Sequence, residues 1–260
     1  MTNIQFQSGA INAGDCVSNA WNLVKQNFGM YLGISLIAMI LAGCIPCISL
    51  FLVGPILGGV FYVVLREMRG EPVEFGMMFK GFDKFVPLMV IGLVQMIPEI
   101  IGQILRVVVQ VGQIGLDGRR NGDFQFFAPS DPQFAIASGV LIIAAIVGLV
   151  VVIFAIAWRV LLFFALPIAL ENDIGPIDAM KLSAQAAMSN VGGLIVLFIF
   201  EGLLALAGIL ALCIGIFFVI PILYAANAFA YRQVFPWIQD NFNMAPPPPT
   251  AYGNFGSGMQ

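Results

Sequence analysis

Long apolar runs separated by short amphipathic stretches dominate the chain. The apolar runs cover about residues 29–50, 54–69, 86–113, 135–170, 192–212 and 214–234. Between them, apolar positions recur at helical spacing in segments 11–28, 75–85 and 171–190. About 20 apolar residues cross a bilayer as a helix, whereas a helix with a single apolar face lies in the membrane interface. The pattern predicts an all-α, polytopic membrane helix bundle of about six transmembrane helices with interfacial amphipathic helices.

Local signals predict where these helices begin and bend. Asp15 is predicted to cap the first amphipathic helix. Pro98 is predicted to kink the third span, because proline removes a helical hydrogen bond and its ring clashes with the preceding turn. Run 135–170 would form a helix of about 54 Å, which is longer than a bilayer core. We therefore expect this run to tilt, bend or break, at Arg159 or Pro167.

An internal repeat relates the two ends of the chain. Residues 47–57 read CISLFLVGPIL and residues 213–223 read CIGIFFVIPIL, so seven of eleven positions are identical. Arg66 and Arg232 follow the two copies in the same register. Each copy reads as an amphipathic helix, Asn-x-Gly, a span, a turn, a proline, a second span and an arginine. We infer a duplicated hairpin in parallel orientation, with a less similar third unit between the copies.

The repeat and the composition together define the domain organisation. Pro55 is predicted to open the second helix of the first copy. The proline-rich end of the chain is too polar and too repetitive to pack into a bundle. The expected segments are a flexible N-terminus (1–10), a single membrane domain (11–235) with repeat copies at about 15–69 and 178–235, and a disordered, Pro-rich cytoplasmic tail (236–260).

Composition and charge agree with an integral membrane protein. The chain is 60% hydrophobic and 10% charged, whereas soluble domains are about 45–50% apolar and about 25% charged. Six spans place both termini on one side, and the positive-inside rule makes the side richer in Lys and Arg cytoplasmic. The side of the termini carries eight such residues and the other side three: Lys25, Arg66, Arg69, Lys80, Lys84, Arg159, Lys181 and Arg232 against Arg106, Arg119 and Arg120.

A polar stripe runs along the third span and is the most unusual feature of the apolar segments. Its spacing places all members on one helical face. In lipid, such a stripe must face protein or water. Three interpretations stay open: contacts between helices, a water-filled or ligand-lined groove, and an amphipathic helix on the far membrane surface. The members are Gln95, Glu99, Gln103, Arg106, Gln110 and Gln113.

Two further charged residues lie within apolar runs. Arg159 and Glu201 fall at similar expected depths of about 18 Å and about 14 Å from the cytoplasmic side, so we expect an ion pair between them. Arg106 is expected to extend to the far interface. Glu99 is then the carboxylate left without a partner. These residues form either a proton or substrate site, or a set of contacts that fixes helix register.

Cysteine and histidine content limits the possible chemistry. Cys44 and Cys47 form a C-x-x-C pair, which has the spacing of a redox disulfide. Cysteine is also a common apolar filler in spans, and no base or cation lies near this pair in the sequence. The chain has no histidine, and it lacks nucleotide-binding and hydrolase motifs. We therefore expect no catalytic residues, metal, cofactor or nucleic-acid partner.

Several local motifs follow one another in a characteristic order along the chain. They are Asn27-Phe28-Gly29, Gly54-Pro55, Arg69-Gly70-Glu71-Pro72, 75–82, 175–179 and Tyr231-Arg232-Gln233. This order resembles that of poorly characterised bacterial multi-pass inner-membrane proteins grouped with the membrane domain of glycerophosphodiester phosphodiesterases. The resemblance covers about residues 11–235 and implies an all-helical bacterial membrane protein. It does not imply phosphodiesterase activity, because the sequence contains no phosphodiesterase domain.

These observations lead to three functional hypotheses for a protein of the bacterial inner membrane. The first is a scaffold or a lipid- or envelope-associated factor without enzymatic activity. The second is a small transporter or carrier that uses the polar stripe. The third is a membrane thiol redox enzyme that uses Cys44 and Cys47. The expected partner is the lipid bilayer, and both a protein bound to the Pro-rich tail and a homo-oligomer stay open.

Overall fold

The computed structural model describes residues 4–43, 46–117, 132–211 and 215–237. Helices make up 84% of the structure and no strand occurs in these residues, which confirms the all-α prediction. In chain order the elements are α1 (Ala13–Gln26), α2 (Phe28–Gly43), α3 (Pro46–Met68), the 3-10 helix η1 (Phe75–Lys84), α4 (Phe85–Gln95), α5 (Ile97–Asp117), α6 (Pro132–Leu161), α7 (Ala165–Glu171), α8 (Pro176–Met188), α9 (Val191–Leu210) and α10 (Gly215–Val234).

The helices are suited to a multi-pass membrane protein. Within the described ranges, four helical segments are long and apolar enough to cross a membrane. The number rises to six if two bent pairs, α1 with α2 and η1–α4 with α5, are each counted as one span. The predicted six spans are therefore the upper end of what the helices allow.

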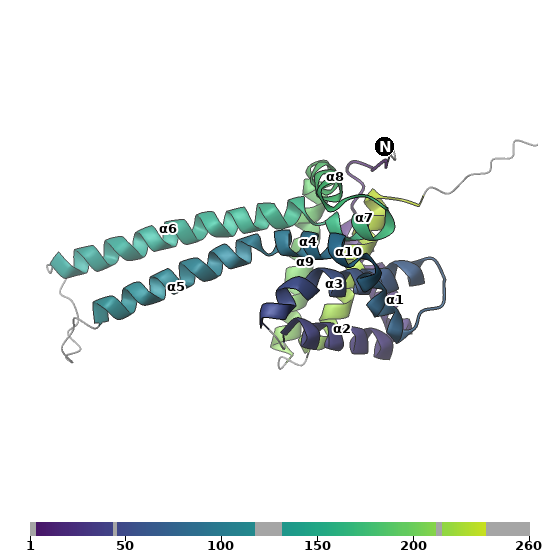
Figure 1. Ribbon diagram of the computed structural model, residues 1–260, viewed down its shortest axis with the longest axis horizontal. Coiled ribbons are helices and arrows are strands. Elements are labelled where there is room, and N and C mark those ends of the chain that lie inside the picture. The colour runs from purple at the N-terminus through teal and green to yellow at the C-terminus, as the bar shows by residue number, and fades with distance from the viewer. Residues whose placement is uncertain (1–3, 44–45, 118–131, 212–214, 238–260) are drawn as a thin grey trace, which may run out of the picture.

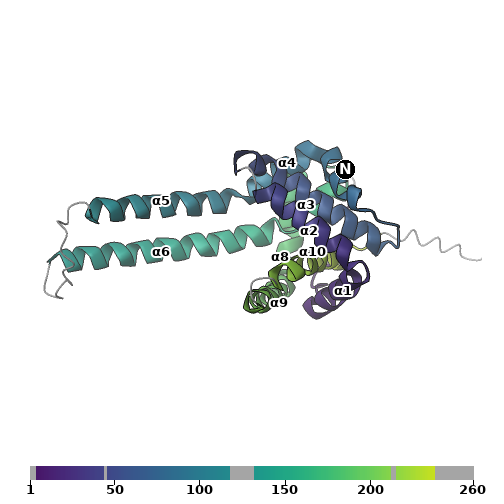
Figure 2. The same ribbon diagram turned by 90° about the horizontal axis from the view of Figure 1, so that it is seen from below.

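Two helical hairpins, α2–α3 and α9–α10, form the bundle with shorter elements packed across them (Figures 1 and 2). Helix α1 packs chiefly on α10, η1 packs on α3, and α8 packs on α6 and α7. The buried core between them contains large side chains such as Tyr31, Phe164 and Tyr231. Each amphipathic element thus packs chiefly on helices other than the one that directly follows it in the chain.

Glycines let η1 approach α3 more closely than any other residue would allow. A Cβ added to Gly59 would lie 1.6 Å from the Met78 carbonyl oxygen, and one added to Gly81 would lie 2.1 Å from the Pro55 carbonyl oxygen. Small residues at such crossings allow backbone-to-backbone packing, which drives helix association when the surroundings are apolar. Glycine at these positions therefore determines how closely η1 packs on α3.

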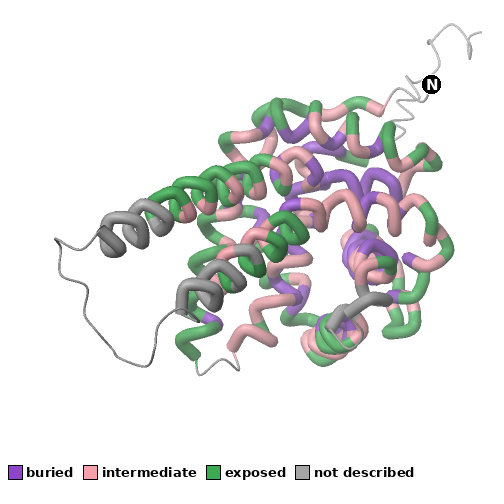
Figure 3. Tube along the Cα trace, turned by 60° about the vertical axis from the view of Figure 1, so that its left-hand side comes forward, coloured by how far each residue is buried: buried purple, intermediate pink, exposed green. Residues whose placement is uncertain are grey.

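Helices α5 and α6 form an arm that extends away from the rest of the bundle (Figures 1 and 2). The described part of the arm is mostly exposed, in contrast to the buried segments of the bundle (Figure 3). Exposed apolar side chains are the normal surface of a segment surrounded by lipid tails. They include Ile101, Ile104, Val107, Ile143, Ile146, Leu149, Val150, Val152, Ile153 and Ile156.

The predicted bends occur close to where the sequence signals placed them. The third span breaks at Met96, between α4 and α5, with a bend of 41° just before Pro98. The long run breaks after Leu161, two residues beyond Arg159, and resumes as α7 at Ala165. Pro167 lies inside α7, so it is not the point of the break. Helix α1 makes an angle of 103° with α2 and lies across it, as an interfacial helix does.

Two predicted helix starts are wrong. The N-cap of α1 is Asn12, whose side-chain oxygen accepts a hydrogen bond of 3.3 Å from the Asp15 backbone amide. Helix α3 begins at Pro46, and Pro55 lies inside it. Proline favours the first turn of a helix, where its missing amide leaves no gap, and Pro46 occupies that place. Helices packed closely around an interior proline such as Pro55 can compensate for its missing hydrogen bond.

The beginning of the chain is anchored from residue 4 onward, in place of the flexible end that the sequence predicted. The Gln7 amide donates to the Val234 carbonyl at 2.9 Å, and the Asn12 amide donates to the Gln233 side chain at 2.8 Å. The Asn190 side chain accepts from the Ala10 amide and donates to the Gln7 carbonyl, both at 2.9 Å. We call residues 4–12 the N-terminal strap. It ties the start of α9 to the end of α10.

Candidate functional site

The first residue of the polar stripe makes contacts between helices. The Gln95 side-chain amide donates to the Leu162 carbonyl oxygen at 2.9 Å, where α6 has just ended. In the opposite direction, the Trp158 indole N–H donates to the Val94 carbonyl oxygen at 2.9 Å, near the break after α4. Helix ends leave carbonyl groups without helical partners, so the Trp158 bond satisfies one such group near the break after α4, whereas the Leu162 carbonyl also accepts from the Ala165 amide at 3.2 Å. Gln95 thus joins the end of α4 to the segment after α6.

The rest of the stripe lies on the exposed surface of the arm. Glu99, Gln103, Arg106 and Gln110 are all exposed, and none makes a hydrogen bond or ion pair with another described residue. Gln113 lies in α5, and its side chain is outside the described part of the chain. The stripe thus forms one polar flank of an otherwise apolar hairpin, which lipid tails alone cannot solvate.

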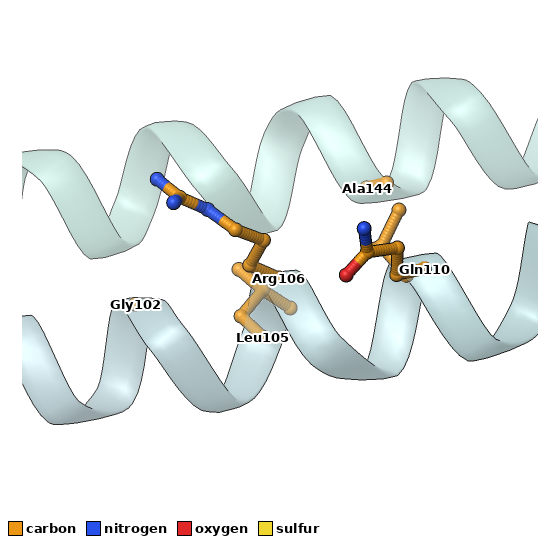
Figure 4. A pocket seen from close by; sticks show the side chains of 6 residues that line it. Gly102, Leu105, Arg106, Gln110 and Ala144 are labelled. Atoms are coloured by element: carbon orange, nitrogen blue, oxygen red, sulfur yellow. The ribbon is translucent and has the colours of Figure 1, made fainter.

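A shallow cavity of about 380 Å³ lies beside this flank, between α5 and α6. Figure 4 shows the Arg106 and Gln110 side chains on α5 projecting toward the helix that carries Ala144. Gly102 and Leu105 form part of its floor. The cavity brings one cation and one amide together, so it could hold a small polar molecule.

The different environments of two glutamines give a direct test of the stripe. We expect Gln95→Leu to lower the free energy of unfolding by about 1 kcal/mol, because the Leu162 carbonyl loses its side-chain donor at 2.9 Å and keeps only the Ala165 amide at 3.2 Å. The same substitution at the exposed Gln103 should leave stability unchanged. Reversible unfolding in mixed detergent micelles, followed by circular dichroism, measures both variants. An equal loss at Gln103 would contradict its exposure in the structure.

Arg159 and Glu201 do not form the expected ion pair. No nitrogen–oxygen distance between the two side chains is 4.0 Å or less. Arg159 is exposed, whereas one Glu201 carboxylate oxygen is buried without a hydrogen-bond partner in that part of the chain. The two groups therefore do not form a direct ion pair.

The predicted redox pair is not tested by the structure. Cys44 lies outside the described residues, and the Cys47 side chain does too, although its backbone belongs to α3. Cys16 is described: it is buried on α1, and its thiol donates to the Gln233 side-chain oxygen at 3.3 Å. Within the described residues, no group of three or more Cys, Asp or Glu side chains could hold a metal ion.

A polar cluster that the sequence did not predict lies where α3, α7 and α10 end. The Glu171 carboxylate accepts from three side chains: Arg69 at 2.6 Å, the Tyr231 hydroxyl at 2.9 Å, and Arg232. The Trp237 ring lies over both guanidinium groups, 4.5 Å from Arg232 Cζ and 5.8 Å from Arg69 Cζ. We call these five residues the arginine–glutamate cluster. It joins three elements through one shared carboxylate.

Other polar residues in this part of the sequence have partners of their own. Arg66 pairs with Glu71 at 3.1 Å, on the turn after α3. Glu67 accepts hydrogen bonds from the Asn27 amide at 2.7 Å and from the Tyr31 hydroxyl. These contacts join the end of α3 to the junction between α1 and α2.

The loop after α7 is attached to η1 in a similar way. Lys84 lies 2.8 Å from Asp173 and also approaches the backbone carbonyls of Ala169 and Asn172 at 3.4 Å. The hydrogen bond and the charge of Lys84 lower the pKa of the Asp173 carboxyl group below its usual value. Since Asp173 is fully exposed, this ion pair contributes little to stability.

One signal for the cluster was present in the sequence. Arg66 and Arg232 follow the repeated segment in the same register, which marks the ends of α3 and α10 as related. Their partners differ, because Arg66 pairs with nearby Glu71 and Arg232 pairs with Glu171. Glu171 is 102 positions from Arg69 and 61 from Arg232, and no local pattern relates residues at such separations.

Comparison with known proteins reveals relatives but gives no activity. No protein-family model and no solved structure match the chain. Three proteins named as uncharacterised are similar to it: Rv2560 and MT2637 of two Mycobacterium tuberculosis strains, and Mb2590 of Mycobacterium bovis. Each is 24% identical over 236 residues, which cover 88% of this chain and 70% of the relative. The similarity therefore extends over most of the helical bundle.

Proposed function

We propose that this chain is a multi-pass protein of the bacterial inner membrane that acts as a scaffold or a lipid- or envelope-associated factor, without enzymatic activity. The observation that carries the proposal is the arginine–glutamate cluster. It gathers positive charge at the ends of α3 and α10, beside the end of the described chain. The cytoplasmic leaflet is rich in anionic lipids, which attract such groups.

The same observation supports an orientation with both termini in the cytoplasm. Arg66, Arg69 and Arg232 lie at helix ends on the side to which the N-terminal strap is tied. Basic residues next to spans favour the cytoplasmic side. Arg106, by contrast, lies on the arm, away from this side of the bundle (Figures 1 and 4).

The packing also supports an internal repeat of three units. The units are α1–α3, η1–α6 with α7, and α8–α10. The amphipathic element of each unit packs on the second span of another unit, in a closed cycle: η1 on α3, α8 on α6 and α7, and α1 on α10. Such cyclic packing fits a parallel repeat around an axis along the membrane normal. The proposal includes kinship with the membrane domain of glycerophosphodiester phosphodiesterases, which rests on the order of local motifs in the sequence.

A second candidate function is that of a small carrier. It is favoured by the cavity beside Arg106 and Gln110 and by the exposed amides of the stripe. A cysteine introduced at Gln103 distinguishes the two functions. A carrier with a solvated groove reacts with a membrane-impermeant thiol reagent at this position, whereas a scaffold with a lipid-covered arm does not.

Reporter fusions test the proposed orientation. We expect alkaline phosphatase fused after Asp117, at the end of α5, to be active, because this enzyme folds only outside the cytoplasm. The same enzyme fused after Trp237 should be inactive, and green fluorescent protein should give the opposite pattern at both sites. Active phosphatase after Trp237 would overturn the proposed orientation, and reporters without any membrane association would overturn the proposal as a whole.

A further inference from the structure

We propose that the arginine–glutamate cluster is a binding site for an anionic phosphate ester, with Arg69 as the contacting residue and Arg232 as the second charge beneath it. This inference rests on the proposed membrane function and names the ligand class. Two sources share this chemistry, the headgroup of an anionic phospholipid and a soluble phosphate ester.

The charge balance of the cluster leaves room for one anion. Arg69 and Arg232 share the single carboxylate of Glu171, and the third partner, Tyr231, is a neutral donor. The group therefore carries one positive charge in excess. The headgroup of an anionic lipid such as phosphatidylglycerol carries one negative charge, so its phosphate would neutralise the cluster.

Unused hydrogen-bond donors show where the anion would bind. Arg69 bonds Glu171 through Nη2 alone, and its Nε and Nη1 have no partner in the described ranges. Its side chain is 43% exposed, so these groups are accessible. Arg232 is 9% exposed, and its buried Nε also lacks a hydrogen bond to any described residue. A guanidinium presents donors in a planar fork that matches two phosphate oxygens.

Trp237 places the site at the level of lipid headgroups. Its ring covers both guanidinium groups and is 40% exposed. Tryptophan is enriched at the membrane–water interface, where its apolar ring meets the acyl chains and its N–H remains hydrated. A phosphate bound to Arg69 would lie at the edge of this ring, where a phospholipid carries its phosphate.

The acidic groups that the structure describes near the cluster do not cancel its excess charge. Glu71 is bound by Arg66, and Asp173 is bound by Lys84. Glu67 is held by two neutral donors at the junction of α1 and α2. Each carboxylate thus has partners of its own, and Glu171 is the carboxylate bonded to Arg69 and Arg232.

Native mass spectrometry of the full chain in detergent tests the proposal. Wild-type protein is titrated with phosphatidylglycerol or with phosphatidylcholine, whose headgroup is neutral overall. We expect one phosphatidylglycerol molecule to be retained preferentially. Arg69→Gln should weaken this binding about tenfold, because it removes a charge-assisted hydrogen bond. Arg69→Lys keeps the positive charge but loses the planar arrangement of donors. It should therefore weaken binding less than Arg69→Gln does, and it controls for a loss of binding that results from misfolding.

Arg66→Gln is the matched control. It removes the same charge from the same helix end, but Arg66 pairs with Glu71 and not with Glu171. Equal weakening by Arg66→Gln, or equal retention of phosphatidylcholine, would overturn the proposal. Competition by millimolar glycerol 3-phosphate would identify a soluble ester as the ligand, and no competition would identify the lipid. If the reporter pattern is reversed but phosphatidylglycerol is still retained specifically, the proposed orientation is wrong and the proposed binding site still holds.

Discussion

Replacing Glu171 with glutamine is expected to lower the free energy of unfolding by about 3 kcal/mol. The substitution leaves two guanidinium groups without their shared carboxylate, and Arg232 is almost fully buried. Removing one partner of a buried ion pair typically costs about 3–5 kcal/mol, because the remaining charge has lost its water as well as its partner. We place the effect at the low end, because Arg69 is partly exposed. Unfolding in mixed detergent micelles measures it.

Glu71→Gln provides the control for this prediction. Glu71 also pairs with an arginine near the end of α3, but it is 42% exposed. Exposed ion pairs contribute about 0–1 kcal/mol, so its loss should be small. If both variants lose the same stability, the cluster does not behave as a buried ionic group. A Glu171→Gln protein as stable as the wild type would remove the basis for the proposed site.

Gly59→Ala is the second substitution with a large expected effect. The new Cβ would lie 1.6 Å from the Met78 carbonyl oxygen, which is backbone and cannot move aside as a side chain can. We expect η1 to separate from α3 and stability to fall by about 3 kcal/mol, the upper end of the cost of overpacking. Thermal unfolding in detergent measures the loss.

Two other glycines make this test specific. A Cβ on Gly58 would meet the end of the Leu88 side chain at 2.5 Å, so rotation of that side chain should limit the loss. A Cβ on Gly202, in α9, meets nothing within 4 Å, so Gly202→Ala should be neutral or slightly stabilising. The expected order of stability is Gly202→Ala, then Gly58→Ala, then Gly59→Ala. Any other order would contradict the close packing of η1 on α3.

Features that depend on neighbouring residues were predictable from the sequence. The all-α fold follows from the long apolar runs, and the break next to Pro98 follows from proline chemistry. The break after Leu161 follows from a run too long for one bilayer. These signals act within one or two helical turns, so the sequence carries them directly.

Features that depend on distant residues were not predictable. Glu171 meets Arg69 and Arg232 only after α3, α7 and α10 have packed together. The same holds for Asn190, which binds the N-terminal strap from 180 positions away. The expected ion pair of Arg159 and Glu201 likewise joined residues far apart in the sequence, and their side chains do not come within 4.0 Å. Similar depth in a membrane does not by itself bring two side chains into contact, because the path of the chain decides which helices are neighbours.

The N-terminal strap has a consequence for how the protein is made. Helix α1 leaves the ribosome first, yet its main packing partner is α10, the last helix described. The strap also binds the Val234 carbonyl at the end of α10. Until α10 has been synthesised and inserted, α1 lacks its main packing partner, and the strap has only its contacts to Ser189 and Asn190 at the start of α9. Assembly of the bundle is therefore completed when α10 packs on α1, so a nascent chain stalled before α10 would expose the part of the apolar face of α1 that α10 covers.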